Sequence, residues 1–448
     1  MLEKYKFFYS IYIITFWIMM CWGFVSQEFL PFLQSLDSVV LLLGDAVLIM
    51  LGIVMMRNRG DFVFLAVYLL MAFISTILVN KVGMIHYLNG ARDFIGLLFV
   101  VPIVRWFLMS DRKADFCKSM NRQLRVWLYV QAFCITWQFV KYGANDAGGG
   151  SFGYGSSGMV STLIFAVSFY FVIRRWDYNN IWQSIKQNKE YLILLYPTML
   201  NETKISFAYL LIYIVLLVKV DRTLFIKSIF MVPVAAAVFA LVFSIYVDVT
   251  NQSSEDILSE DFLEEYFFGS GSDIAYHAEL AQRYFDGEFD DALSVEWWAM
   301  DVPRMAKLVL LYPVIRDEPG GFWTGVGVGH MKGTRTIKPT KFYKEYEWTL
   351  FGTRMLLLFI VMELGIPGLI WWLWGFFRIT CLRRKGLPYF DKRIALFITA
   401  QMVMAMFYTD YLRMAAPWMI FAYMLLQPRY TAPETVEEEK PALSYSLP

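Results

Sequence analysis

The residues best suited to chemistry lie between positions 304 and 344, where a glycine-rich loop is flanked by basic residues. Arg304 begins a short apolar stretch broken by Pro313, and the glycines Gly325, Gly327 and Gly329 follow. Such a loop can turn its backbone N–H groups toward an anion. The positive charge continues with His330, Lys332, Arg335, Lys338, Lys341 and Lys344. The segment is a candidate phosphate site, although a surface loop with a solvated basic run fits the same residues equally well.

Three side chains could accept a proton in such a site. His330 follows the glycine loop directly, whereas Glu347 and Asp410 stand near the ends of apolar runs. A lone histidine is more often a hydrogen-bonded structural residue, so all three assignments stay open. A further carboxylate, Asp45, lies inside an apolar run. Facing lipid would be costly, so Asp45 must pair within the protein or line a cavity.

These residues are held by helices that cross a membrane. The chain is 58% hydrophobic and 18% charged, whereas soluble domains have about 45–50% and about 25%. Its apolar runs are long enough for bilayer spans, in which each helix satisfies its own backbone hydrogen bonds. The sequence predicts an all-α integral membrane protein of about twelve spans. We place them at 7–25, 38–56, 62–79, 93–109, 126–140, 159–173, 190–200, 205–218, 228–247, 350–378, 393–408 and 412–426.

The distribution of Lys and Arg orients these spans. With the N-terminus inside, the cytoplasmic ends hold 24 Lys and Arg residues and the short outside loops hold five, which is a strong positive-inside bias. We therefore divide the chain into spans at 1–247, a large outside domain at 248–349, further spans at 350–427 and a disordered cytoplasmic tail at 428–448. Apolar residues at helical spacing predict a mainly helical outside domain. A net charge of +1 gives no reason to expect nucleic acid.

Three motifs carry a resemblance to a known family. The segment from Arg304 through Pro313 to the Gly325-Val326-Gly327 loop resembles the pattern before the last long span of the O-antigen ligase and Wzy O-antigen polymerase superfamily. GSFGYGSSG at 150–158 resembles its small-residue motif at the start of a middle span, and Glu363 to Gly368 resembles its E-x-G-x-x-G motif. Together with the topology, the resemblance covers most of the chain and is one of arrangement more than of identity.

The resemblance implies a GT-C-like glycosyltransferase of the bacterial inner membrane whose active site faces the periplasm. Its reaction would be an inverting, metal-independent transfer of a glycan from an undecaprenyl-diphosphate donor to a lipid-linked repeat unit, with no cofactor. The product would be O-antigen, capsule or exopolysaccharide. The implied partners are the undecaprenyl-diphosphate-linked oligosaccharide, membrane lipids and, as a candidate, a chain-length regulator protein.

The site residues of the family are matched to positions of this sequence one at a time. Arg304 matches the family's arginine at the end of the large loop, which would hold the donor diphosphate. Lys204 occupies the place of the family's Ser-Arg pair, and Arg354 stands where ligases have a His-Asn pair, nine residues before Glu363. Fixed cations such as these, with Arg335, would stabilise the charge that develops on a leaving diphosphate. The exchange of His-Asn for Arg354 argues against the ligase subgroup.

Other functions stay open. An O-antigen ligase would share the donor chemistry. A lipid-linked oligosaccharide flippase or other transporter would also have about a dozen spans and cationic cavity residues, but transporters built from inverted repeats should show matching halves. We find no such duplication, and the insertion at 248–348 breaks any symmetry. A receptor or scaffold would leave the cations near the outer span ends unexplained.

Fusions to alkaline phosphatase test the orientation. Because the positive-inside bias places 248–348 outside, the enzyme joined near Ser270 should be active and the enzyme joined near Arg122 inactive. The reverse pattern of activity would overturn the orientation and every site assignment that depends on it.

Overall fold

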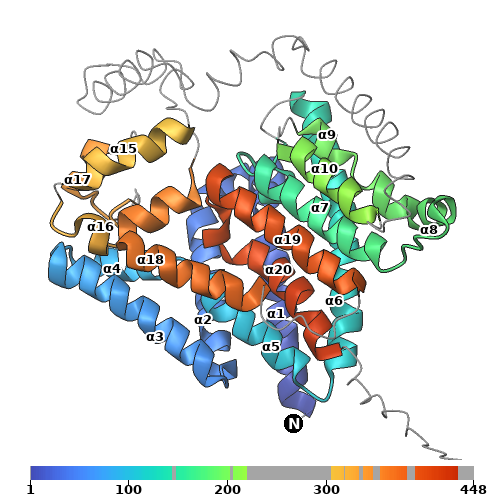
Figure 1. Ribbon diagram of the computed structural model, residues 1–448, viewed down its shortest axis with the longest axis horizontal. Helices are drawn as coiled ribbons and strands as arrows, with labels where there is room; N and C mark the ends of the chain where they lie inside the picture. The colour runs from blue at the N-terminus through green and yellow to red at the C-terminus, as the bar shows by residue number, and fades with distance from the viewer. Residues whose placement is uncertain are drawn as a thin grey trace, which may run out of the picture.

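The computed structural model describes residues 2–143, 148–201, 205–218, 304–316, 318–331, 337–346, 354–380 and 389–431, and every regular element within these ranges is a helix. The all-α class is thereby confirmed for the part of the chain that is described. The α-helices are α1 (Leu2–Phe24), α2 (Asp37–Met55), α3 (Arg59–Phe73), α4 (Met84–Ala91), α5 (Val101–Leu108), α6 (Lys113–Tyr142), α7 (Ser157–Ile173), α8 (Ile181–Ile193), α9 (Pro197–Leu200), α10 (Ile205–Leu217), α15 (Arg304–Arg316), α16 (Gly321–Thr324), α17 (Lys341–Tyr346), α18 (Leu356–Thr380), α19 (Tyr389–Tyr408) and α20 (Ala415–Thr431) (Figure 1). Shorter 3-10 or π-helical segments join them: η1 (Val25–Phe29), η2 (Pro31–Leu36), η3 (Ile74–Val79), η4 (Gly96–Val100), η5 (Gly150–Phe152) and η8 (Tyr411–Arg413).

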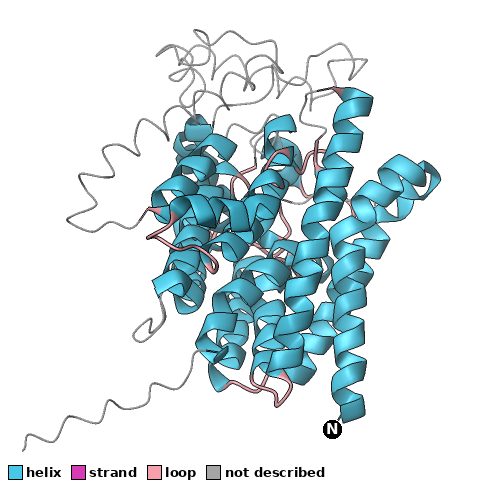
Figure 2. Ribbon diagram, turned by 90° about the vertical axis from the view of Figure 1, so that its right-hand side faces the viewer, coloured by secondary structure: helices cyan, strands magenta, loops and turns pink. Residues whose placement is uncertain are grey.

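Several of these helices are suited to a membrane. Four helical segments are long and apolar enough to cross a bilayer: Glu3–Phe29, Pro31–Met55, Arg59–Val79 and Leu356–Thr380. Their outer faces carry large apolar side chains, such as Met50 and Leu70, which are 60% and 59% exposed. Figure 2 shows long helices lying side by side with the N-terminus at one end of the bundle. The membrane prediction is supported, whereas the count of twelve spans and the domain boundaries remain predictions.

The expected span at 190–200 is not one continuous helix. α8 ends at Ile193 and α9 begins at Pro197. The two follow α7 in the opposite direction, because Ser168 Oγ donates to the Tyr191 carbonyl and Asn201 Nδ2 donates to the Ser157 carbonyl at the start of α7. Pro197 has no N–H for the Ile193 carbonyl, and a helix cannot run through that position undisturbed. The expected span at 228–247 and residues 248–303 lie outside the described ranges.

The centre of the bundle is built on α7. Nearly every side chain from Ser157 to Ile173 is buried, and α6, α10, α19 and α20 pack around this helix. Two polar side chains of this core are hydrogen-bonded: Thr162 Oγ1 donates to Tyr209 Oη at 3.1 Å, and Gln401 Nε2 donates to the Thr162 carbonyl at 3.0 Å. Such pairing avoids the cost of a buried polar group without a partner.

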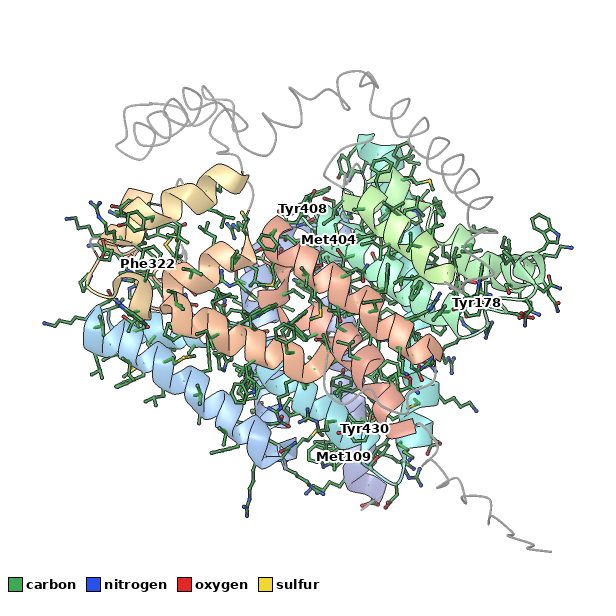
Figure 3. All side chains as sticks on the ribbon, in the orientation of Figure 1. Met109, Tyr178, Phe322, Met404, Tyr408 and Tyr430 are labelled. Carbon is green, nitrogen blue, oxygen red and sulfur yellow. The ribbon has the colours of Figure 1, made fainter. Side chains whose placement is uncertain are left out.

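A break in α18 binds the glycine loop to the bundle. Gly365 has φ 67°, and two residues later Pro367 cannot donate to the Glu363 carbonyl. The loop supplies the missing donors: Val326 N–H donates to the Met362 carbonyl at 2.7 Å and Gly327 N–H donates to the Glu363 carbonyl at 3.1 Å. α16 accordingly lies against α18, where Figure 3 labels Phe322.

The close packing of Gly365 against α16 predicts that Gly365→Ala destabilises the protein. At φ 67° and ψ −165° the backbone lies in a region essentially restricted to glycine, which costs another residue about 1–3 kcal/mol, and a Cβ on Gly365 would lie 2.5 Å from the Phe322 carbonyl oxygen. Thermal unfolding of detergent-purified protein should show a lowered midpoint. Gly83→Ala is the matched control, because a Cβ there meets nothing within 4 Å. Equal midpoints for both variants would contradict the role assigned to the break.

Candidate functional site

A large cavity lies among the helix ends that face away from the N-terminus. Its volume is about 730 Å³. The cavity is lined by the second half of α1, the first half of α2, the segments before α7 and α18, and the turn around η8. Because α1 starts at the N-terminus and its far half lines the cavity, the cavity lies toward the opposite end of the bundle. Its charged lining residues are Asp37, Asp45, Arg92, Asp93, Arg354, Asp410 and Arg413.

Arg413 is a buried charge of this group. Its side chain is 8% exposed and pairs with Asp93, while Glu363 Oε2 lies 3.8 Å from Nη2 and Asp410 Oδ2 lies 3.9 Å from Nη1. The guanidinium carbon also lies 3.8 Å from the centre of the Phe359 ring. Three carboxylates around one guanidinium compensate the loss of hydration that burial imposes on the cation. Arg413 therefore acts as a fixed charge that holds the cavity wall together.

Two other arginines that line the cavity differ from Arg413 in their burial and in their ion pairs. Arg92 follows α4 and is half-buried, and Arg354 stands exposed just before α18. Neither makes an ion pair with any residue that the structure describes. Both line the cavity, so their guanidinium groups can serve an anionic ligand with bidentate hydrogen bonds. Arg354 was predicted from the sequence, and Arg92 was not singled out.

The glycine loop does not offer its N–H groups to the cavity. Besides the bonds to α18, Val328 N–H donates to Thr76 Oγ1 at 2.9 Å and Gly329 N–H donates to Glu363 Oε1 at 3.2 Å. Residues 325–329 are buried, and Gly329 packs closely on α4 near Gly90. The loop expected to bind an anion instead joins η3, α4 and α18. Through Glu363, it also reaches Arg413.

The predicted proton acceptors are separated in space. Asp410 lines the cavity beside Arg413 and is 17% exposed in its side chain. His330 is not among the cavity-lining residues and stacks on Phe342, with ring centres 5.5 Å apart. Glu347, Lys204 and Arg335 lie outside the described residues, and Arg304 is described only as the first backbone position of α15.

The second small-residue motif shapes the other side of the cavity. Within GSFGYGSSG, Gly150 N–H donates to Gln138 Oε1 at 2.8 Å and Ser151 N–H donates to Gln131 Oε1 at 3.0 Å. These bonds fix the segment to α6, and a Cβ on Gly23 of α1 would clash with the carbonyl of Phe152. Phe152 and Ser156 are thereby placed in the cavity lining.

The position of Asp45 in the structure confirms one prediction. The sequence required this carboxylate either to pair within the protein or to line a cavity, and it lines this one. Two further lining residues, Trp22 and Asp37, were not foreseen; the indole Nε1 donates to Asp37 Oδ1 at 2.7 Å. Within the described ranges, no group of three or more His, Cys, Asp or Glu side chains is arranged to hold a metal ion.

The burial of His330 predicts a pH dependence of stability. Burial, with a smaller contribution from His86, lowers the pKa of His330 from 6.5 to about 4. Between these values the unfolded chain binds a proton that the folded chain does not, so the free energy of unfolding should fall as the pH drops from 6.5 toward 4. His330→Gln should flatten this part of the curve of unfolding midpoint against pH. His86→Gln should keep most of the slope, and equal slopes for His330→Gln and the wild type would contradict the assignment.

Comparison with known proteins adds no family to this description. A scan against protein-family models and a search of curated proteins both find no match. The resemblance to the O-antigen ligase and polymerase superfamily rests on the motifs and the topology alone.

Proposed function

We propose that the chain is a membrane glycosyltransferase that polymerises lipid-diphosphate-linked glycan repeat units. The observation that carries the proposal is the cavity at the helix ends, where Arg92 and Arg354 have no carboxylate partner among the described residues. Two uncompensated guanidinium groups in a cavity of about 730 Å³ suit a diphosphate with attached sugars. By the distribution of Lys and Arg, this end of the bundle is the periplasmic one.

The arginines would act on the leaving group. When the bond between the anomeric carbon and the diphosphate oxygen breaks, negative charge grows on that oxygen. Fixed cations stabilise this charge more in the transition state than in the ground state, which accelerates the reaction. Arg354 and Arg92 supply two such cations. Arg304, whose side chain is not described, and Lys204 and Arg335, which lie outside the described ranges, remain predicted additions.

Asp410 would accept the proton of the acceptor hydroxyl. The hydroxyl oxygen attacks the anomeric carbon from the side opposite the diphosphate, so the configuration inverts and the proton passes to a carboxylate. Asp410 lines the cavity, and its Oδ2 lies 3.9 Å from Arg413 Nη1. In this proposal the glycine loop and His330 lie outside the cavity lining and have a structural role.

The polymerase is favoured over the alternatives. A ligase would transfer the same glycan to a lipid A core sugar, and Arg354 occupies the position of the ligase His-Asn pair. A flippase would move the lipid-linked glycan without making a glycosidic bond. An assay that follows bond formation separates these functions.

Arginine variants test the proposal. Purified enzyme should convert lipid-diphosphate repeat units into a ladder of longer glycans. Arg354→Ala and Arg92→Ala should each slow this reaction by roughly a hundred- to a thousandfold, the usual effect of removing one preorganised charge-stabilising group. Lysine at either position should retain part of the rate because it keeps the charge without the bidentate geometry. The same comparison of alanine and lysine applies to Arg304.

Arg122→Ala is the matched control, because Arg122 is exposed on α6 and does not line the cavity. Its ladder should form at the wild-type rate. Ladders at the normal rate from Arg354→Ala and Arg92→Ala would remove these arginines from the site, and transport of the substrate without ladder formation would favour a flippase.

A further inference from the structure

The cavity has a second wall whose chemistry differs from that of the arginines. Along the first half of α2, Asp37, Leu41 and Asp45 all line the cavity. Positions four residues apart lie on one face of a helix, so these three form a single stripe about 12 Å long. Trp22 and Met19 of α1 stand beside it. We call this set the α1–α2 wall.

The indole of the α1–α2 wall is held in place. Trp22 Nε1 donates to Asp37 Oδ1 at 2.7 Å, which joins the two helices at the cavity. The hydrogen bond leaves the second oxygen of the Asp37 carboxylate able to accept from a ligand. Asp45 lies two turns deeper inside an otherwise apolar helix, where a carboxylate requires a polar environment. The cavity contributes to that environment.

The α1–α2 wall repels the group that the arginines attract. A diphosphate placed next to the Asp37 carboxylate would meet a negative charge in a cavity, where charges are screened less than in bulk water. A neutral polyol meets no such penalty, because its hydroxyls donate to carboxylates in charge-assisted hydrogen bonds. An indole face offers an apolar surface on which a sugar ring can pack. The two sets of residues therefore sort the parts of a substrate by charge.

We infer that the α1–α2 wall is the binding site for the acceptor saccharide, whose hydroxyl-bearing end is remote from any diphosphate. This inference rests on the proposed function and adds to it: the arginines hold the donor diphosphate, and Trp22, Asp37 and Asp45 hold the acceptor sugar. Asp37 and Asp45 are positioning residues, since they bind the acceptor away from the bond that breaks.

Two probes separate the acceptor site from the donor site. One is undecaprenyl diphosphate; the other is the oligosaccharide released by mild acid from lipid-linked material of the source cells. Affinity for each is measured on the full chain in detergent. The double variant Asp37→Asn with Asp45→Asn should weaken oligosaccharide binding by roughly ten- to a hundredfold. Undecaprenyl diphosphate should bind no more weakly, because a repulsive charge is removed at Asp37. Arg354→Ala should show the opposite pattern.

Two further variants test whether the effect on oligosaccharide binding is specific to this part of the cavity. Leu41→Trp fills the middle of the stripe and should block the oligosaccharide while leaving both carboxylates, and the 41% exposure of Leu41 leaves space for the larger side chain without disturbing the core. Asp115→Asn changes an exposed carboxylate of α6 outside the cavity and should alter neither affinity.

The outcomes distinguish the two proposals. A wild type that binds neither probe overturns the proposed function. A wild type that binds undecaprenyl diphosphate, together with α2 variants that keep the wild-type affinity for the oligosaccharide, overturns the acceptor site while the proposed function stands. A wild type that fails to bind the oligosaccharide at all, yet builds ladders, also overturns it.

Discussion

The buried cluster of Arg413 with Asp93, Glu363 and Asp410 is the interaction on which the cavity depends. Its members come from the turn after α4, from α18 and from the turn around η8. Withdrawing one guanidinium from water costs several kcal/mol, which only close opposite charges offset. The same carboxylate of Glu363 also accepts the Gly329 N–H. One charge network thus joins the cavity wall to the glycine loop.

The sequence identified the glycine loop as a distinctive segment, but the role of the loop in the structure differs from the predicted one. Its glycines were expected to expose N–H groups to an anion. They are required because the loop fits between η3, α4 and the break in α18, where the Pro367 ring removes a donor and Gly365 reverses the sign of φ. The sequence showed that the loop and the E-x-G-x-x-G motif were both unusual. It could not show that they are hydrogen-bonded to each other, because 36 residues separate Gly327 from Glu363.

The parts that the sequence predicted best are those dictated by the bilayer. Hydrocarbon demands long apolar helices, so α1, α2, α3 and α18 begin and end near the predicted positions. The segment at 190–200 was predicted less well, because apolar character alone does not reveal the effect of Pro197 on the helix. Asp45 could be singled out because a charge within an apolar run is costly, and Arg354 because it stands at the position of the ligase His-Asn pair in the family resemblance. Trp22, Asp37 and Arg92 are ordinary residues for helix ends, and only the packing of these ends around one cavity gives them significance.

The two ends of the bundle use their charges differently. Away from the cavity, Asp61 of α3 pairs with Arg105 of α5 and with Arg378 of α18, the latter at 2.6 Å, and Arg174 pairs with Asp391 at 3.5 Å. There Arg105, Arg378 and Arg174 have carboxylate partners, and the charges serve to join helices. At the cavity Arg413 is surrounded by carboxylates, whereas Arg92 and Arg354 have none among the described residues. Arg92, which is half-buried, and Arg354, which is exposed, therefore add no ion pair that joins helices among the described residues. Under the proposed function, their positive charges would face the diphosphate of a bound substrate.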